Sequence, residues 1–206
     1  MVMLMERIKH AWKEGSRYSV VFMDVAGAFN YVLHRRLIHN LRKRQAPPDF
    51  IVRWIADFLE NRSSRLSFNE VEPEPICTNA GVLQGSPLSP ILYMFYNADL
   101  LDIPGTRSGV LGLGFIDDIA FGVQGETEER NAREPERMLR EAEEWRERHG
   151  AKFEERKYVL VHFTKRNSET TDTAYVRIGH TMIKPAEQAK YLGVLFDCKL
   201  TFQQHI

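Results

Sequence analysis

Hydrophobic residues recur at helical spacing in several stretches of the chain. They predict helices over 3–12, 29–41, 50–59, 91–101 and 127–149; Pro135 should restart or bend the last helix, and Gly150 should end it. Mostly apolar, β-favouring runs predict strands over 18–23, 113–116, 119–123, 158–163, 174–178 and 191–196. Two further strands, 65–68 and 75–79, flank a proline-rich bend and can pair antiparallel. Interleaved helices and strands without a repeat predict one α+β domain.

The overall composition leaves the function open. Lys plus Arg and Asp plus Glu each number 28 in 206 residues, so net charge argues neither for nor against a nucleic-acid partner. Cys77 and Cys198 are isolated and offer neither a disulfide framework nor a zinc pattern, which agrees with a reducing compartment. No apolar run approaches the roughly 20 residues of a membrane span, and no signal peptide opens the chain. We therefore expect a soluble intracellular protein without a membrane partner, in the nucleus or cytoplasm, with an organelle left open.

Local charge is more informative, because basic residues concentrate between positions 34 and 44. Arg35 and Arg36 lie within the predicted helix 29–41, and Arg42 and Lys43 directly follow it. Such a cluster forms either a solvated helix face or a contact surface for phosphates.

Asp117 and Asp118 form an adjacent acidic pair with apolar residues on both sides. If the flanking segments are short strands, the pair falls at a tight hairpin turn and presents hard oxygen ligands at one point. That arrangement suits Mg²⁺, which binds through few carboxylates together with substrate phosphates. The alternative is a solvated Asp-Asp turn, since aspartate is a common turn former.

Asp24 is the candidate third carboxylate, at the end of the apolar run 18–23. A two-ion site for phosphoryl transfer needs carboxylates from separate elements, and an antiparallel sheet can bring a strand tip beside a hairpin. Alone, Asp24 would be read as a helix cap or a strand-terminating residue. With Asp117 and Asp118 it predicts one Mg²⁺ or Mn²⁺ site holding two ions, with Asp24 and Asp117 carboxyl oxygens within about 8 Å of each other.

The segment 83–90 is the second unusual element. Gly85 permits close approach of a backbone, and Gln84 and Ser86 supply neutral hydrogen-bonding groups. Such a loop can hold a template base or a nucleotide sugar. The alternative is a turn followed by a helix that begins at a proline.

These segments together carry a family resemblance. The blocks FMDVAGAFN at 22–30, GVLQGSPLSP at 81–90 and FIDD at 115–118 occur in that order. Trp145, His149-Gly150, Lys157 and the segment 191–194 follow them. The ordered set, over residues 1–206, resembles the reverse transcriptase domain of non-long-terminal-repeat retrotransposons.

The resemblance implies a right-hand polymerase palm with partial fingers, an antiparallel sheet backed by helices, which catalyses template-directed deoxynucleotide addition with two metal ions. Its expected partners are an RNA template, a DNA primer and deoxynucleoside triphosphates; the oligomeric state is left open. The implied residues are the metal aspartates Asp24, Asp117 and Asp118; Lys157 as a general acid toward pyrophosphate; Phe29 as a steric gate, with Gln84 and Gly85 at the nucleotide; Tyr191, Leu192 and Gly193 as a primer grip; and Arg35 and Arg36 at template or primer phosphates.

The chain also departs from the family pattern. Position 30 is Asn where Asp is usual, and Ile116 stands where a smaller residue is usual. Residues 1–206 are expected to cover the palm, without the N-terminal fingers and the C-terminal thumb. One alternative is therefore a degenerate retroelement remnant without catalysis, which at most binds nucleic acid or a protein partner. A palm-fold nucleotide cyclase or repair polymerase would share the metal aspartates but not the 84–90 block.

Overall fold

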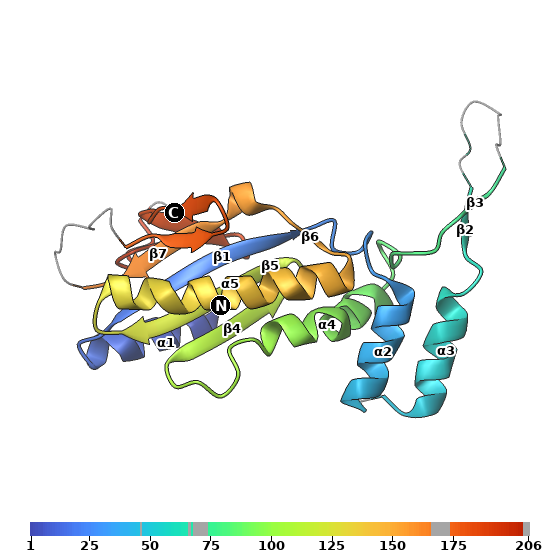
Figure 1. Ribbon diagram of the computed structural model, residues 1–206, viewed down its shortest axis with the longest axis horizontal. Coiled ribbons are helices and arrows are strands. Elements are labelled where there is room, and N and C mark those ends of the chain that lie inside the picture. Colours follow the sequence, from blue (N-terminus) through green and yellow to red (C-terminus); the bar gives the residue numbers. More distant parts are fainter. Residues whose placement is uncertain (46, 66, 68–73, 166–173, 204–206) are drawn as a thin grey trace.

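A five-stranded antiparallel sheet forms the centre of the computed structural model, which describes residues 1–45, 47–65, 67, 74–165 and 174–203 (Figure 1). Its strands are β1 (Arg17–Ala26), β4 (Val110–Phe115), β5 (Asp118–Gly125), β6 (Lys152–Phe153) and β7 (Val159–Phe163). The order is β4-β5-β1-β6, and β7 also pairs with β1. β1 is thus bonded along both edges, to β5 on one side and to β7 and then β6 on the other.

Helices cover both faces of this sheet. α4 (Leu88–Leu101) and α5 (Glu128–His149) contact one face, and α5 crosses in front of the strands in Figure 1. α1 (Val2–Lys13) contacts β1 and β5 on the other face. α5 begins at Thr127, whose hydroxyl accepts from the Arg130 amide, and ends at Gly150 in the left-handed conformation, as expected.

Alternate side chains of β1 enter two different cores, because successive residues of a strand point to opposite faces. Val21, Met23 and Val25 join the cluster under α4 and α5. Val20 and Phe22 join the second cluster, which includes residues of α1 and of the C-terminal strands. Odd-numbered residues of β1 therefore face α4 and α5, and even-numbered residues face α1 and the C-terminal strands.

A helical pair lies beside one end of the sheet (Figure 1). It consists of α2 (His34–Arg44) and α3 (Asp49–Leu59), and α2 also contacts α4. The short strands β2 (Ser63–Ser64) and β3 (Ile76–Cys77) pair antiparallel and extend away from the pair. The 3₁₀ helix η1 (Glu155–Lys157) follows β6, and two hairpins complete the chain: β8 (Val176–Ile178) with β9 (Thr181–Ile183), and β10 (Gln188–Tyr191) with β11 (Val194–Asp197).

The α+β class, the antiparallel central sheet and the helices backing it are as predicted, but some boundaries were wrong. The helix expected over 29–41 begins at His34, because residues 27–31 form turns that start at Gly27 (φ +58°). The strand expected over 191–196 is the β10–β11 hairpin, which turns at Leu192 (φ +49°) and Gly193 (φ +81°).

Two further expectations differ in part from the structure. α5 continues through Pro135 without restarting. Residues 76–77 pair antiparallel as expected, but with Ser63–Ser64, while most of the expected strand and bend between 66 and 73 lies outside the described residues. Within the described ranges, no helix combines the length and the hydrophobicity that crossing a membrane requires.

Candidate active site

Asp24 and Asp118 lie directly opposite each other on neighbouring strands. They are register partners in the antiparallel β1–β5 pair. The Val25 amide donates to the Asp117 carbonyl (3.0 Å), so the next pair along, Asp24 with Asp118, is the non-hydrogen-bonded kind. Side chains of such pairs are the closer ones, with Cα atoms typically about 4.5 Å apart. The fold therefore brings two carboxylates from distant parts of the chain to one point on the sheet.

Both carboxylates belong to the face that carries α1 and the β10–β11 hairpin. Asp24 follows Phe22 by two residues, and Phe22 lies in that core. The Phe22 ring contacts Tyr191 of β10, with centroids 5.3 Å apart. Burial first, and then the negative charge of Asp118, raises the pKa of Tyr191 to about 12. The Tyr191 side chain and the turn at Leu192 and Gly193 thus lie on the same side of the sheet as the aspartates.

Asp117 lies in the turn between β4 and β5. The preceding Ile116 has φ +58°, a left-handed conformation that is uncommon for a β-branched residue. The turn is held from α4, because the buried Asn97 amide donates to the Ile116 carbonyl at 3.0 Å. Asp117 is therefore positioned by a strained turn with a fixed carbonyl.

The site is rich in negative charge. Burial, followed by the charges of Asp117 and Asp24, raises the pKa of Asp118. The Lys157 ammonium donates to Asp24 Oδ2 at 2.9 Å and opposes that shift. The same hydrogen bond and the Asp24 charge raise the pKa of Lys157, which is exposed and stays protonated.

The donor set fits a hard divalent cation in its chemistry, because Asp24 and Asp118 lie opposite each other at one end of the β1–β5 pair and Asp117 lies in the adjoining turn. Asp24 is only part-exposed, and the Lys157 ammonium is its cationic partner. In their present rotamers, however, no three His, Cys, Asp or Glu side chains of the described residues converge closely enough to hold an ion. The expected three-aspartate metal site is therefore incomplete in this side-chain arrangement.

The expected nucleotide-binding residues lie near one another. Gln84 Nε2 donates to Asn30 Oδ1 (3.2 Å), and the Val82 amide donates to the Phe29 carbonyl (2.8 Å). Gly81 makes this approach possible, since a Cβ there would lie 3.0 Å from the Asn30 carbonyl oxygen. Gly85 has φ +90° and open space around it, so glycine suits this position because of its backbone conformation and not because a side chain would clash.

The Phe29 ring packs edge-on against Tyr93 of α4, with centroids 5.7 Å apart. Tyr93 is buried, and its hydroxyl has no hydrogen-bond partner among the residues that the structure describes. Sequence patterns had suggested no role for Tyr93 or for Asn30, which was noted only as a departure. The signal that could have found Asn30 is its position within the FMDVAGAFN block; Tyr93 is an ordinary apolar position of α4.

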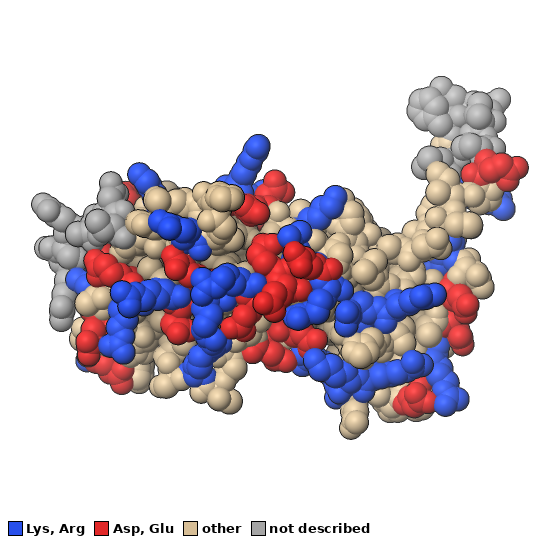
Figure 2. Space-filling view, in the orientation of Figure 1, with Lys and Arg blue, Asp and Glu red and all other residues tan. Residues whose placement is uncertain are grey.

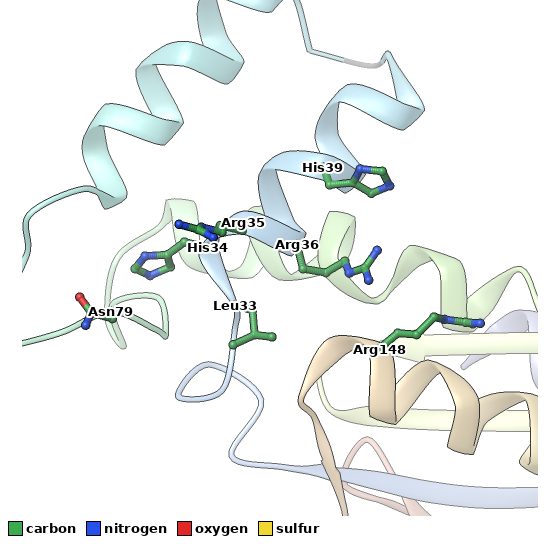
Figure 3. Close-up of a pocket in the computed structure, with 7 residues that line it drawn as sticks. All are labelled: Leu33, His34, Arg35, Arg36, His39, Asn79 and Arg148. Atoms are coloured by element: carbon green, nitrogen blue, oxygen red, sulfur yellow. The ribbon is translucent and has the colours of Figure 1, made fainter.

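Arg35 and Arg36 lie apart from the aspartates. They extend from the first turn of α2 in different directions: Arg36 points toward Arg148 at the end of α5, and Arg35 points to the side of His34 (Figure 3). α4 and α5 contact the sheet face opposite Asp24 and Asp118, and α2 packs on α4 as part of the same core. Lys and Arg side chains gather over this region in Figure 2. Whether Arg35 and Arg36 contact primer or template stays a prediction.

Comparison with known proteins agrees with this geometry. The chain is similar to the probable RNA-directed DNA polymerase from transposon BS of Drosophila melanogaster, with 29% identity over 98% of this chain and 22% of that protein. It is 28% identical to the RNA-directed DNA polymerase from mobile element jockey of the same species, over 94% of this chain and 21% of the relative. The chain thus spans about a fifth of the length of these relatives.

Solved structures support the fold. Telomerase from Candida tropicalis, in complex with a TWJ fragment of telomeric RNA, superposes with a TM-score of 0.67 at 11% identity, covering 98% of this chain and 33% of that protein. The apo enzyme gives a TM-score of 0.66. The expected polymerase palm fold is confirmed. The family described as reverse transcriptase (RNA-dependent DNA polymerase) matches residues 1–196, and the chain belongs to that family.

Proposed function

We propose that this chain is the catalytic palm of an RNA-directed DNA polymerase, which adds deoxynucleotides to a DNA primer on an RNA template. The observation that carries the proposal is the cross-strand pairing of Asp24 with Asp118 beside the Asp117 turn, in a chain of this family. Three carboxylates at one end of a strand pair are costly unless a cation offsets their charge. A solvated turn would not need Asp24 opposite it.

Asp24, Asp117 and Asp118 are the residues that would hold two Mg²⁺ or Mn²⁺ ions. When bound, such ions activate the primer hydroxyl and neutralise the triphosphate. The primer 3′ oxygen bonds to the α-phosphorus of the nucleotide, and the bond from that phosphorus to the bridging oxygen breaks. Pyrophosphate leaves, and the hydroxyl proton goes to water.

Lys157 acts in this proposal as the general acid that gives a proton to pyrophosphate. Its hydrogen bond to Asp24 keeps it protonated. The same contact makes it a weaker acid, so Lys157 must leave Asp24 before it protonates the leaving group. Lys157 would be released from that contact if Asp24 held a cation.

Phe29, Gln84 and Gly85 would bind the nucleotide. The Phe29 ring, supported by Tyr93, excludes a ribose 2′-hydroxyl, and Gln84 contacts the nucleotide and the templating base. Tyr191, Leu192 and Gly193 support the primer end, consistent with the contact of Tyr191 and Phe22 on the aspartate face. Arg35 and Arg36 bind nucleic-acid phosphates.

Primer extension on an RNA template with Mg²⁺ or Mn²⁺ tests the proposal. The Asp117→Asn, Asp118→Asn double variant should lose extension, because each change removes a negative charge while keeping the side-chain shape. Asp57→Asn, on the exposed surface of α3, is a control for loss of a carboxylate away from the site and should retain extension. Extension by the wild type no greater than by the double variant would favour the alternative, a remnant that only binds nucleic acid or a partner.

A further inference from the structure

A groove beside α2 is lined by Leu33 and by several residues with cationic or hydrogen-bonding side chains. It has a volume of about 500 Å³ and lies between α2, the end of α5 and the segment before Gly81 (Figure 3). Within the described ranges of the chain, no carboxylate lines it. We call it the basic groove; its polar lining is His34, Arg35, Arg36, His39, Asn79 and Arg148.

The guanidinium charges of the basic groove are poorly neutralised by the protein. In the described part of the chain, Arg35 and Arg36 form no ion pair, and Arg148 has only an exposed contact with Glu144 at 3.8 Å. Exposed pairs of that kind contribute little. Three guanidinium groups thus remain available to an anion, and guanidinium matches phosphate geometry in a bidentate manner.

The cationic surface is longer than a single phosphate needs. A neighbouring pocket of about 560 Å³ between α2 and α3 shares His34, Arg35 and His39 and adds Arg42; Glu60 is its one acidic lining residue. Arg42 lies seven residues after Arg35, which is about 10 Å along a helix axis. An extended polyanion fits this surface better than a single small anion.

The basic groove adjoins the expected nucleotide site. A pocket of about 360 Å³ beside Gln84 is lined by Asn30, Thr78 and Gly81, while Asn79 lines the basic groove. The segment 78–81 therefore separates the two, and His34 Nε2 is bound to the Gly81 carbonyl at 2.8 Å. A nucleic-acid strand that leaves Gln84 needs to cross only this segment to reach the arginines.

The helices that border the basic groove, α2 and α5, belong to the core opposite the face of Asp24 and Asp118, which carries α1 and the β10–β11 hairpin. A primer terminus held at the aspartates therefore lies on the other face of the sheet from these helices. The occupant of the basic groove is therefore a part of the nucleic acid beyond the paired region.

We propose that the basic groove binds the phosphate backbone of the unread, single-stranded 5′ part of the RNA template. The proposal rests on the proposed function, because it assumes that a templating base lies at Gln84. It assigns Arg148, Arg36 and Arg35 a role in holding the template outside the catalytic site.

Binding of RNA templates annealed to a DNA primer, measured by fluorescence anisotropy without nucleotide, tests this. The templates carry a short or a long 5′ overhang, about two or about ten nucleotides, because single-strand sites commonly span about 4 to 16 nucleotides. The wild type should bind the long overhang more tightly. The triple variant Arg35→Gln, Arg36→Gln, Arg148→Gln should lose that gain, and its log affinity should fall less steeply with log salt, by about 2 in slope.

The control is a triple variant with the same loss of charge elsewhere on α5: Arg130→Gln, Arg133→Gln, Arg140→Gln. It should keep the overhang gain. An equal loss in both triple variants, or a wild type without the gain, would overturn the proposal. The Asp117→Asn, Asp118→Asn variant should abolish extension and still bind the long overhang more tightly than the short one.

The two proposals can therefore fail separately. If the wild type binds the long overhang more tightly but does not extend the primer, only the catalytic proposal is contradicted. If it extends the primer but binds both overhangs equally, only the proposal for the basic groove is contradicted.

Discussion

His149 should make the stability of this protein depend on pH, because the fold buries its imidazole in the neutral form. The side chain is only 1% exposed. Its Nδ1 lies 2.9 Å from the Trp145 carbonyl, which can only accept, so Nδ1 carries the hydrogen. Nε2 then accepts from Asn40 Nδ2 at 3.3 Å. A second proton on Nε2 would face the Asn40 donor.

The magnitude follows from the pKa. Burial, reinforced by the positive charges of Arg36 and Arg148, lowers the pKa of His149 from 6.5 to about 4. Below pH 6.5 the unfolded chain takes up this proton while the folded chain does not, so the stabilisation is present above pH 6.5 and is lost as the pH falls toward 4. Between pH 7 and pH 5 the loss amounts to about 2 kcal/mol, and its full extent is about 3 kcal/mol.

Urea unfolding at several pH values, followed by tryptophan fluorescence, measures this contribution. Other groups also titrate in this range, including the buried His162, whose pKa is likewise lowered by burial. The informative quantity is therefore the difference between the wild type and His149→Gln, a variant that keeps hydrogen-bonding capacity without a titrating ring. That difference should shrink by about 2 kcal/mol from pH 7 to pH 5. Parallel stability curves for the two proteins would refute the reasoning.

Three further variants test how the site is built. Gly81→Ala should lower the urea midpoint, corresponding to about 1–3 kcal/mol, because φ is +88° and the new Cβ would meet the Asn30 carbonyl; an unchanged midpoint would contradict the close approach. Asn97→Ala should remove the hydrogen bond to the Ile116 carbonyl at a cost of about 1–3 kcal/mol and weaken Mn²⁺ binding in calorimetric titration; unaltered Mn²⁺ affinity would show that the turn does not depend on it. Lys157→Met should increase Mn²⁺ affinity, by removing the ammonium that competes at Asp24, and lower the extension rate about 10²- to 10⁴-fold; equal losses of both would contradict the general-acid role.

Much of the sheet could be predicted from the sequence because its strands are local apolar runs. Successive side chains in the segments around Asp24 and Asp118 enter two different cores. Both segments are therefore short, mostly apolar runs, which is the pattern that predicts a buried strand. The predicted single strand over 191–196 failed for a related reason. Its apolar residues continue across Leu192 and Gly193, so hydrophobicity conceals a turn that only the backbone conformation reveals.

The contacts that assemble the site were less predictable. Gln84 meets Asn30 across 54 positions of sequence, and Lys157 meets Asp24 across 133. No spacing rule relates such residues; the order of family motifs made Gln84 and Lys157 candidates but not their partners. The basic groove was hidden for the same reason, since Arg148 comes from a helix whose charges resemble an ordinary solvated face.

The hydrogen bonds on both sides of Asp24 restrict which parts of the site can move. On one side, the following residue donates to the Asp117 carbonyl; on the other, the Asp24 carbonyl accepts from the Glu154 amide at 3.1 Å. The main chain at Asp24 therefore cannot shift without breaking one of these backbone hydrogen bonds. Any closure around a nucleotide must therefore come from rotamer changes, the segment before Gln84, or Lys157, so Asp24 is the fixed reference against which the other groups adjust.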